Sequence, residues 1–186
     1  MFRLTDRRPA SMLVAGLLLT LSLGMIPNRS EGSKIMQKTV QLNLWQVIDQ
    51  IGARQPIRRE PVEQLLHTKL VSSDASNPYF TFWNNHADGP IALHDGTQIK
   101  GVELRTGNDD ASAPGALTLT LAGTCVSRQD VKARFAGITL TGAPTGQSLD
   151  EETTFSTPTS WGELVFGFAE RNPDCLSSIG FGAKPE

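Results

Sequence analysis

The spacing of apolar residues changes along this chain from a helical period to the alternation of β-strands. Between residues 44 and 51 apolar side chains recur at i, i+3, i+4 and i+7, which predicts a short amphipathic helix. Asn43 is placed to cap its first turn and Gly52 to end it. A second helix is predicted to open at Glu60-Pro61, because proline is tolerated in the first helical turn, and to bury an apolar stripe over residues 62–66.

Beyond Val71 the chain is predicted to form β-strands. Apolar and charged residues alternate over residues 102–105, so one face of that strand is expected to be buried and the other exposed to water. Asp95-Gly96 is a strong hairpin signal just before it. Gly142–Ser160 is expected to be one long loop. The predicted strands are 79–83, 91–93, 99–105, 117–121, 138–141, 163–168 and 178–181.

A third, short helix is predicted within the strand-rich part. Ser127 and Asp130 have the spacing of a capping box, so the helix is expected over residues 128–135 and to end near Gly137. Two N-terminal helices, this inserted helix and the predicted strands indicate an α+β fold on a largely antiparallel sheet. We expect a single domain over residues 43–186.

The first 26 residues have the pattern of an export signal. Arginines at positions 3, 7 and 8 precede the uncharged, apolar run Met12–Ile26. The run is shorter than the ~20 residues that comfortably span a bilayer, so a cleaved signal peptide is predicted, with an uncleaved membrane anchor as the alternative. Residues 27–42 are expected to form a polar linker.

N-terminal sequencing of the protein isolated from cells distinguishes the signal peptide from the anchor. We expect a mature protein that lacks residues 12–26, whereas an intact Met1 in a membrane fraction would establish the anchor.

The chain has two cysteines, Cys125 and Cys175, which are predicted to form a disulfide in an oxidising compartment. Such a bridge closes a loop of about 50 residues, for which the chain-entropy model gives roughly 4 kcal/mol of stabilisation. The alternative is that Cys125 is a catalytic thiol. It would then need a histidine as its base, and the candidates are His67, His86 and His94.

Charge and motif content narrow the function classes. The chain has 17 basic and 19 acidic residues, a net charge of −2, so no positive excess exists to neutralise nucleic acid. The common nucleophile-elbow, zincin, phosphate-loop and Cys-x-x-Cys signatures do not occur, and no metal or cofactor is expected. His86, Asp88, His94 and Asp95 lie close together in sequence, but their spacing does not specify a tetrahedral metal site, and we interpret them as polar turn residues.

An acidic triplet, Asp150-Glu151-Glu152, lies on the predicted loop. An exposed acidic loop attracts a basic partner and speeds the encounter. Trp161 follows the loop, and tryptophan is over-represented among residues that contribute most to protein interfaces. Asp150, Glu151, Glu152 and Trp161 are therefore the candidate protein-binding residues. A solvated charge run and a core tryptophan remain the alternative interpretation.

Motifs in the C-terminal third resemble those of small exported bacterial proteins. They are Ser148-Leu149-Asp150-Glu151, Trp161-Gly162, Phe166-Gly167-Phe168 and Pro173-Asp174-Cys175-Leu176, and Gly123-Thr124-Cys125 ahead of Asp130-Val131 also fits. In size, export and paired cysteines these proteins are similar to periplasmic immunity proteins that neutralise toxins delivered by type VI secretion. The resemblance implies an exported binding protein and supplies no catalytic residue.

These observations together predict an exported protein that binds another protein in the periplasm, as an immunity protein that occludes a toxin. One alternative is an envelope hydrolase with an unrecognised site. Another is a membrane-anchored structural protein of the envelope, in which case residues 12–26 would be retained and would contact the membrane.

Overall fold

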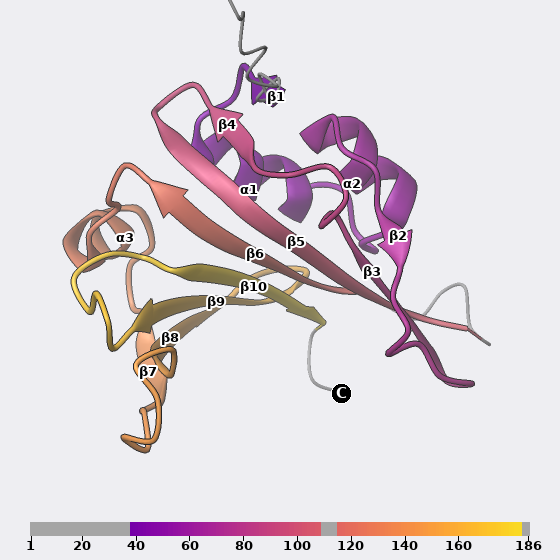
Figure 1. Ribbon diagram of the computed structural model, residues 1–186. Helices are drawn as coiled ribbons and strands as arrows, with labels where there is room; N and C mark the ends of the chain where they lie inside the picture. The colour runs from indigo at the N-terminus through magenta and orange to yellow at the C-terminus, as the bar shows by residue number, and fades with distance from the viewer. Residues whose placement is uncertain (1–37, 109–114, 184–186) are drawn as a thin grey trace, which may run out of the picture. The chain divides into compact units, whose positions relative to one another are not determined.

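The computed structural model describes residues 38–108 and 115–183, and the predicted export segment 1–26 lies outside them (Figure 1). Helices are α1 (Leu44–Gly52), α2 (Arg59–Leu66) and α3 (Arg128–Arg134). Strands are β1 (Lys38–Val40), β2 (Val71–Ser72), β3 (Phe80–Asn84), β4 (Ile91–Leu93), β5 (Thr97–Gly107), β6 (Ala116–Gly123), β7 (Thr139–Gly142), β8 (Glu152–Pro158), β9 (Gly162–Ala169) and β10 (Ser178–Ala183). Within this part of the chain, none of the helices is both long and apolar enough to cross a membrane.

One sheet in the order β1-β4-β5-β6-β10-β9-β8-β7 dominates the fold, and β3 with β2 joins it along β5. Its pairs are antiparallel except for β1 with β4. The predicted α+β class with a largely antiparallel sheet is confirmed, although the sheet is larger than expected and the helices are few. The last strand, β10, lies between β6 and β9 and so joins the two halves of the sheet.

Helices α1 and α2 form where the sequence predicts them because their caps and apolar stripes agree. The Asn43 side chain accepts from the Gln46 N–H while the Gln46 side chain accepts from the Asn43 N–H, which closes a capping box. Asp95, in the β4–β5 turn, accepts from the Leu44 N–H at 2.8 Å and so fastens the start of α1 to the sheet. A carboxylate at this end of the helix is also favoured by the helix dipole.

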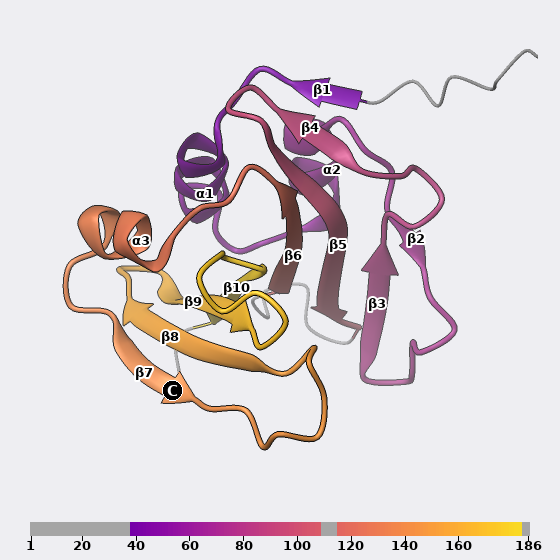
Figure 2. The same ribbon diagram turned by 60° about the vertical axis from the view of Figure 1, so that its left-hand side comes forward.

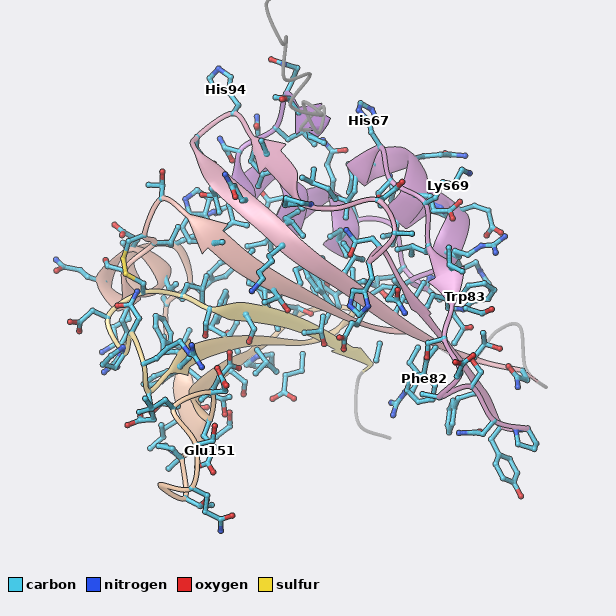
Figure 3. All side chains as sticks on the ribbon, viewed as in Figure 1. His67, Lys69, Phe82, Trp83, His94 and Glu151 are labelled. Atoms are coloured by element: carbon cyan, nitrogen blue, oxygen red, sulfur yellow. A yellow bond between two sulfur atoms is a disulfide. The ribbon has the colours of Figure 1, made fainter. Side chains whose placement is uncertain are left out.

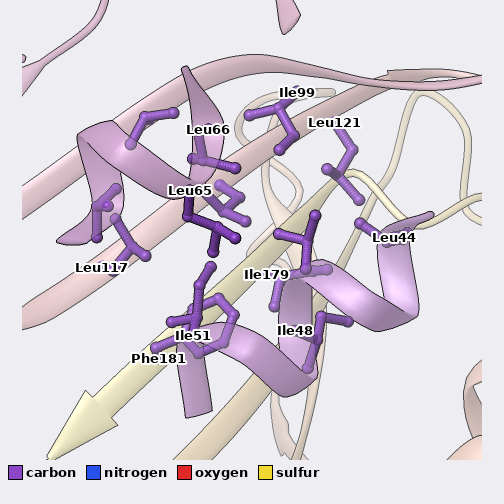
Figure 4. Packing of buried hydrophobic residues seen from close by; sticks show 14 of the residues in the cluster. Leu44, Ile48, Ile51, Leu65, Leu66, Ile99, Leu117, Leu121, Ile179 and Phe181 are labelled. Atoms are coloured by element: carbon purple, nitrogen blue, oxygen red, sulfur yellow. The ribbon is translucent and has the colours of Figure 1, made fainter. Parts of the chain in front are cut away.

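The core lies between these two helices and one face of β5, β6 and β10 (Figure 4). The helices and the sheet both contribute side chains that are almost completely buried. They are Leu44, Val47, Ile48, Ile51, Val62, Leu65 and Leu66 from the helices, and Ile99, Val102, Leu104, Leu117, Leu119, Ile179 and Phe181 from the strands.

A bulge in β5 decides which side chains face this core. Ile99 and Val102 are three positions apart and would face opposite sides of a regular strand, but both are buried because the β5–β6 register shifts between Ile99 and Gly101. After the shift Leu104 is buried, whereas Glu103 and Arg105 are exposed on the opposite face of the sheet. The predicted alternation over residues 102–105 is thus confirmed.

Helix α3 packs beside α1 at one end of the sheet (Figure 2). Its predicted cap is confirmed, because Ser127 Oγ accepts from the Asp130 N–H and the Asp130 carboxylate accepts from the Ser127 N–H. Arg134 pairs with Asp49 of α1 at 2.8 Å. Arg128 lies over the rings of Phe155 and Phe168, with the guanidinium carbon 5.1 and 5.3 Å from the two centroids, and so ties α3 to β8 and β9.

The predicted disulfide is present between Cys125 and Cys175, with Cα atoms 5.1 Å apart. It joins the segment before α3 to the β9–β10 connection. The Leu176 N–H donates to the Val126 carbonyl at 2.9 Å beside it. Because Cys125 is in the bridge, its alternative role as a free catalytic thiol does not apply to this structure.

Two expectations from the sequence differ from the structure. Gly142–Ser160 is not one long loop, because β8 occupies 152–158 within it. Apart from one phenylalanine, β8 is built from hydroxyl residues, a glutamate and a proline, so it lacks the apolar alternation that identifies strands. The predicted linker 27–42 includes β1, whose Val40 is buried against the core although its neighbours are polar.

Candidate functional site

The carboxylates of the acidic triplet have three separate partners rather than one shared exposed surface. Asp150 forms an ion pair with Arg171. Glu151 accepts from the Thr145 hydroxyl at 2.9 Å and from the Gly146 N–H at 3.0 Å, so it closes the turn that follows β7. Figure 3 shows Glu151 on this β7–β8 hairpin, well apart from Phe82 and Trp83 on β3. Glu151 therefore closes the β7–β8 turn, and Asp150 ties the same turn to the β9–β10 connection.

Glu151 is stabilised in its charged form by this turn. The Thr145 hydroxyl contributes most, and the backbone N–H groups of Thr145, Gly146 and Gln147 add to it, so the pKa of Glu151 lies below its usual value. A lowered pKa in the folded protein means that the charged carboxylate favours folding.

Glu152 begins β8 and is half-buried on the sheet. Its two carboxylate oxygens each lie 2.6 Å from a serine hydroxyl, one of Ser177 and one of Ser178. The carboxylate covers Gly167 of β9, where a Cβ atom would lie 2.0 Å from Glu152 Oε2. Glycine at this position therefore makes room for the carboxylate, and Glu152 links β8 to the start of β10.

Trp161 belongs to the margin of the core. Its ring stacks on buried Phe181 with centroids 6.0 Å apart, and a Cβ atom on Gly52 at the end of α1 would lie 2.7 Å from its Nε1. Glu152 and Trp161 flank opposite ends of β8, since Glu152 pairs with Ala169 and Pro158 pairs with Glu163. The structure therefore does not gather the four predicted binding residues into one patch.

The histidines and nearby acids also lie in separate places. His67 and His94 point outward from different turns in Figure 3, and His86 is exposed on the β3–β4 connection. Asp88 accepts from the Thr68 hydroxyl and the Lys69 N–H, at 3.0 and 2.6 Å. Across residues 38–108 and 115–183, no group of three or more His, Cys, Asp or Glu residues is placed to hold a metal ion.

An open groove of about 590 Å³ follows β3. We call it the β3 groove. It is lined by residues of β3, β5, β6, the loop after β2 and the β3–β4 connection, namely Ser73, Ala75, Phe82, Trp83, Asn84, His86, Glu103, Leu104, Arg105, Ala116 and Thr118. Its volume lies within the ~300–1,000 Å³ range of ligand pockets.

Cross-strand pairing arranges side chains of the groove in two rows on the exposed face of the sheet. The first row is Phe82, Arg105 and Ala116, and the second is Asn84, Glu103 and Thr118. The first row thus presents an aromatic ring, a cation and a methyl group. The second presents an amide, a carboxylate and a hydroxyl group.

Two exposed aromatic residues lie next to the groove residues in sequence, one at the start of β3 and one directly before it. Tyr79 is 72% exposed and Phe80 is 39% exposed. The Arg105 guanidinium lies over the Phe80 ring, 5.0 Å from its centroid, where Gly107 opposite Phe80 adds no side chain. The Asn77 side chain accepts from the N–H groups of both aromatic residues at 3.0 Å, so their backbone is held in place.

Side chains of the predicted strand 79–83 divide between the two faces of the sheet. Trp83 is half-buried, donates to the Thr106 hydroxyl at 3.0 Å and carries Arg59 of α2 over its ring. Phe80 and Phe82 lie on the other face. Their pairing with the charged side of β5 is the sequence signal for this surface, but it becomes visible only once the β3–β5 register is known.

Comparison of the chain with models of protein families, with curated proteins and with solved structures gives no match.

We expect Trp161→Ala to lower the free energy of unfolding by about 2–4 kcal/mol, because it removes a half-buried ring from between α1 and β10. Chemical denaturation measures this. Tyr79→Ala is the control, since it truncates a largely exposed ring and should change stability by less than about 0.5 kcal/mol. An unchanged stability of Trp161→Ala would contradict the packing described here and would restore Trp161 as an interface residue.

Glu151→Gln should be less stable than the wild type at neutral pH and should match it in acid. The pKa of Glu151 is lowered in the folded protein, so its contribution is present above the ordinary glutamate pKa and disappears as the pH falls through the folded value. Melting temperatures measured over a pH series test this. Glu170→Gln removes an equal charge from an exposed turn and serves as control. A stability difference for Glu151→Gln that does not depend on pH would refute the assignment.

Proposed function

We propose that this chain is an exported protein that binds another protein in the cell envelope through the β3 groove and its aromatic end, and that it acts as an immunity protein by occluding a toxin. The observation that carries the proposal is the exposure of two neighbouring aromatic residues, Tyr79 and Phe80, on backbone held by Asn77, together with the Arg105 guanidinium over the Phe80 ring. Tyrosine, other aromatic residues and arginine are enriched in protein interfaces, and a fixed backbone lowers the entropy lost on binding.

The acidic triplet and Trp161 support binding less well than the groove. Asp150 pairs with Arg171 of the β9–β10 connection, Glu151 closes the β7–β8 turn, and Glu152 bridges β8 and β10. A charge already paired within the chain gains less from a partner, because binding must first replace its present contacts.

Two features of the chain support export, its N-terminal sequence pattern and its disulfide. The pattern over residues 1–26 is typical of a signal peptide, and the Cys125–Cys175 bridge is of a kind that persists in oxidising compartments. An exported protein with a rigid, bridged sheet is suited to block another protein by covering its working surface.

A photo-crosslinking amino acid tests the proposed surface in living cells. Placed at Tyr79, it should capture a discrete envelope protein. Placed at Leu149, which is 66% exposed on the acidic hairpin, it should not. Combined substitution Tyr79→Ala and Phe80→Ala should reduce capture by a probe at His86 at least about tenfold, within the range of interface hot spots. Capture from Leu149 instead of Tyr79 would show that the acidic hairpin is the binding face.

The immunity role has its own test on the captured protein. Expressed in the envelope without this chain, the captured protein should arrest growth, and co-expression of the wild-type chain should restore it. The chain with Tyr79→Ala and Phe80→Ala should not restore growth, while Leu140→Ala with Leu149→Ala should. A captured protein that does not affect growth would rule out the immunity role and leave binding in place.

A further inference from the structure

Resting on the proposed function, we propose further that the protein partner enters the β3 groove as an extended segment, with a basic and an acidic side chain two residues apart that pair with Glu103 and Arg105. The inference names the chemistry of the partner, which the proposed function leaves open. It follows from the placement, the unused charge and the spacing of these two side chains.

Glu103 and Arg105 are adjacent on the exposed face of β5. Their backbones are two residues apart along one strand, which corresponds to about 6.6 Å at the usual rise of a β-strand. Both side chains line the groove, one in each cross-strand row. A ligand in the groove therefore meets a negative and a positive group at a fixed separation.

Both charges are available for a partner. In the described part of the chain, ion pairs use Arg59 with Glu60, Lys69 with Glu63, Arg134 with Asp49 and Arg171 with Asp150, and none involves Glu103 or Arg105. Cross-strand neighbours of Glu103 are Asn84 and Thr118, which are uncharged.

The Arg105 guanidinium is already oriented. Stacking on Phe80 fixes the end of the Arg105 side chain, which would otherwise lose much rotamer freedom on binding. The N–H groups at the edge of the stacked, planar guanidinium stay free to donate to a carboxylate. A guanidinium can bind a carboxylate through two parallel hydrogen bonds. The acidic residue of the partner is therefore expected to contact Arg105 and the basic residue to contact Glu103.

An extended segment matches this arrangement because it has the same repeat as β5. Its alternate side chains face one side at about 6.6 Å spacing, and the residue between them points away from the groove. The floor beside the two charges is shallow, since Ala116 and Thr118 are small and Gly180 of β10 continues the second row without a side chain. The backbone of a partner can therefore approach the sheet closely there.

Capped pentapeptides are the probes, titrated into the isotope-labelled protein purified from the envelope and followed by NMR. Acetyl-Thr-Lys-Val-Glu-Thr-amide places both charges on one side of an extended chain. Acetyl-Thr-Lys-Glu-Val-Thr-amide has the same composition but places them on opposite sides. We expect the first peptide to bind up to about fivefold more tightly, because the second can place only one of its charges in the groove and an exposed ion pair contributes up to about a factor of five. Amide signals of Phe82 and Arg105 should shift.

Charge reversal should switch the preference. Glu103→Lys should favour the peptide with two glutamates in place of Lys and Glu, and Arg105→Glu should favour the peptide with two lysines. Glu170→Lys and Lys132→Glu make the same changes in net charge at exposed positions outside the groove, and they should keep the wild-type preference. The NMR spectra of the variants also report whether each one is folded.

Equal binding of the two isomeric peptides, a switch produced equally by the control variants, or no binding up to about 10 mM would overturn the inference. The proposed function would survive each of these results if the probe at Tyr79 still captures a partner. If the probe at Tyr79 captures no protein but the peptide preference is intact, the proposed protein partner is ruled out and the groove binds only short dipolar peptides.

Discussion

The core and the proposed binding surface both depend on one constraint, which is the phase of side-chain alternation along β5. Side chains of a strand point to opposite faces in turn, so a shift of one residue exchanges the buried set for the exposed set. The bulge between Ile99 and Gly101 makes that shift. Without it, Val102 and Leu104 would face water, and Glu103 and Arg105 would point into the core beneath α1 and α2. The same irregularity thus completes the core and places two charges beside the aromatic residues of β3.

Local signals explain why the helices and hairpins could be predicted from the sequence. Asn43 and Ser127 satisfy the first N–H groups of their helices through contacts within a few residues, and Asp95-Gly96 makes its turn in the same way. Strand β8 could not be recognised because its hydroxyl-rich sequence carries no apolar alternation, and its place is set by pairing with β9. The cysteines were predicted as a pair from number and compartment alone, and the bridge agrees.

The candidate site was harder to predict because exposure depends on contacts between distant segments. An acidic triplet has the appearance of a charged patch, yet its members contact Arg171, Thr145 and two serines, Ser177 just before β10 and Ser178 at its start. Tryptophan is a typical interface residue, yet Gly52 leaves the space in which the Trp161 ring packs. Conversely, phenylalanine is a typical core residue, but the register of β3 with β5 places Phe80 and Phe82 on the same face of the sheet as Glu103 and Arg105.

The central position of β10 has a consequence for the order in which the chain matures. Strands β6 and β9 each leave one edge open until β10 is inserted between them, and β10 follows both of them in the chain, so it is synthesised after them. The edges of β6 and β9 therefore stay unpaired until β10 pairs with them, and unpaired strand edges promote aggregation. Cys175 lies three residues ahead of β10, so bridge formation with Cys125 holds that segment next to the gap it closes. Formation of the Cys125–Cys175 bridge and completion of the sheet are therefore coupled, and an oxidising compartment favours both.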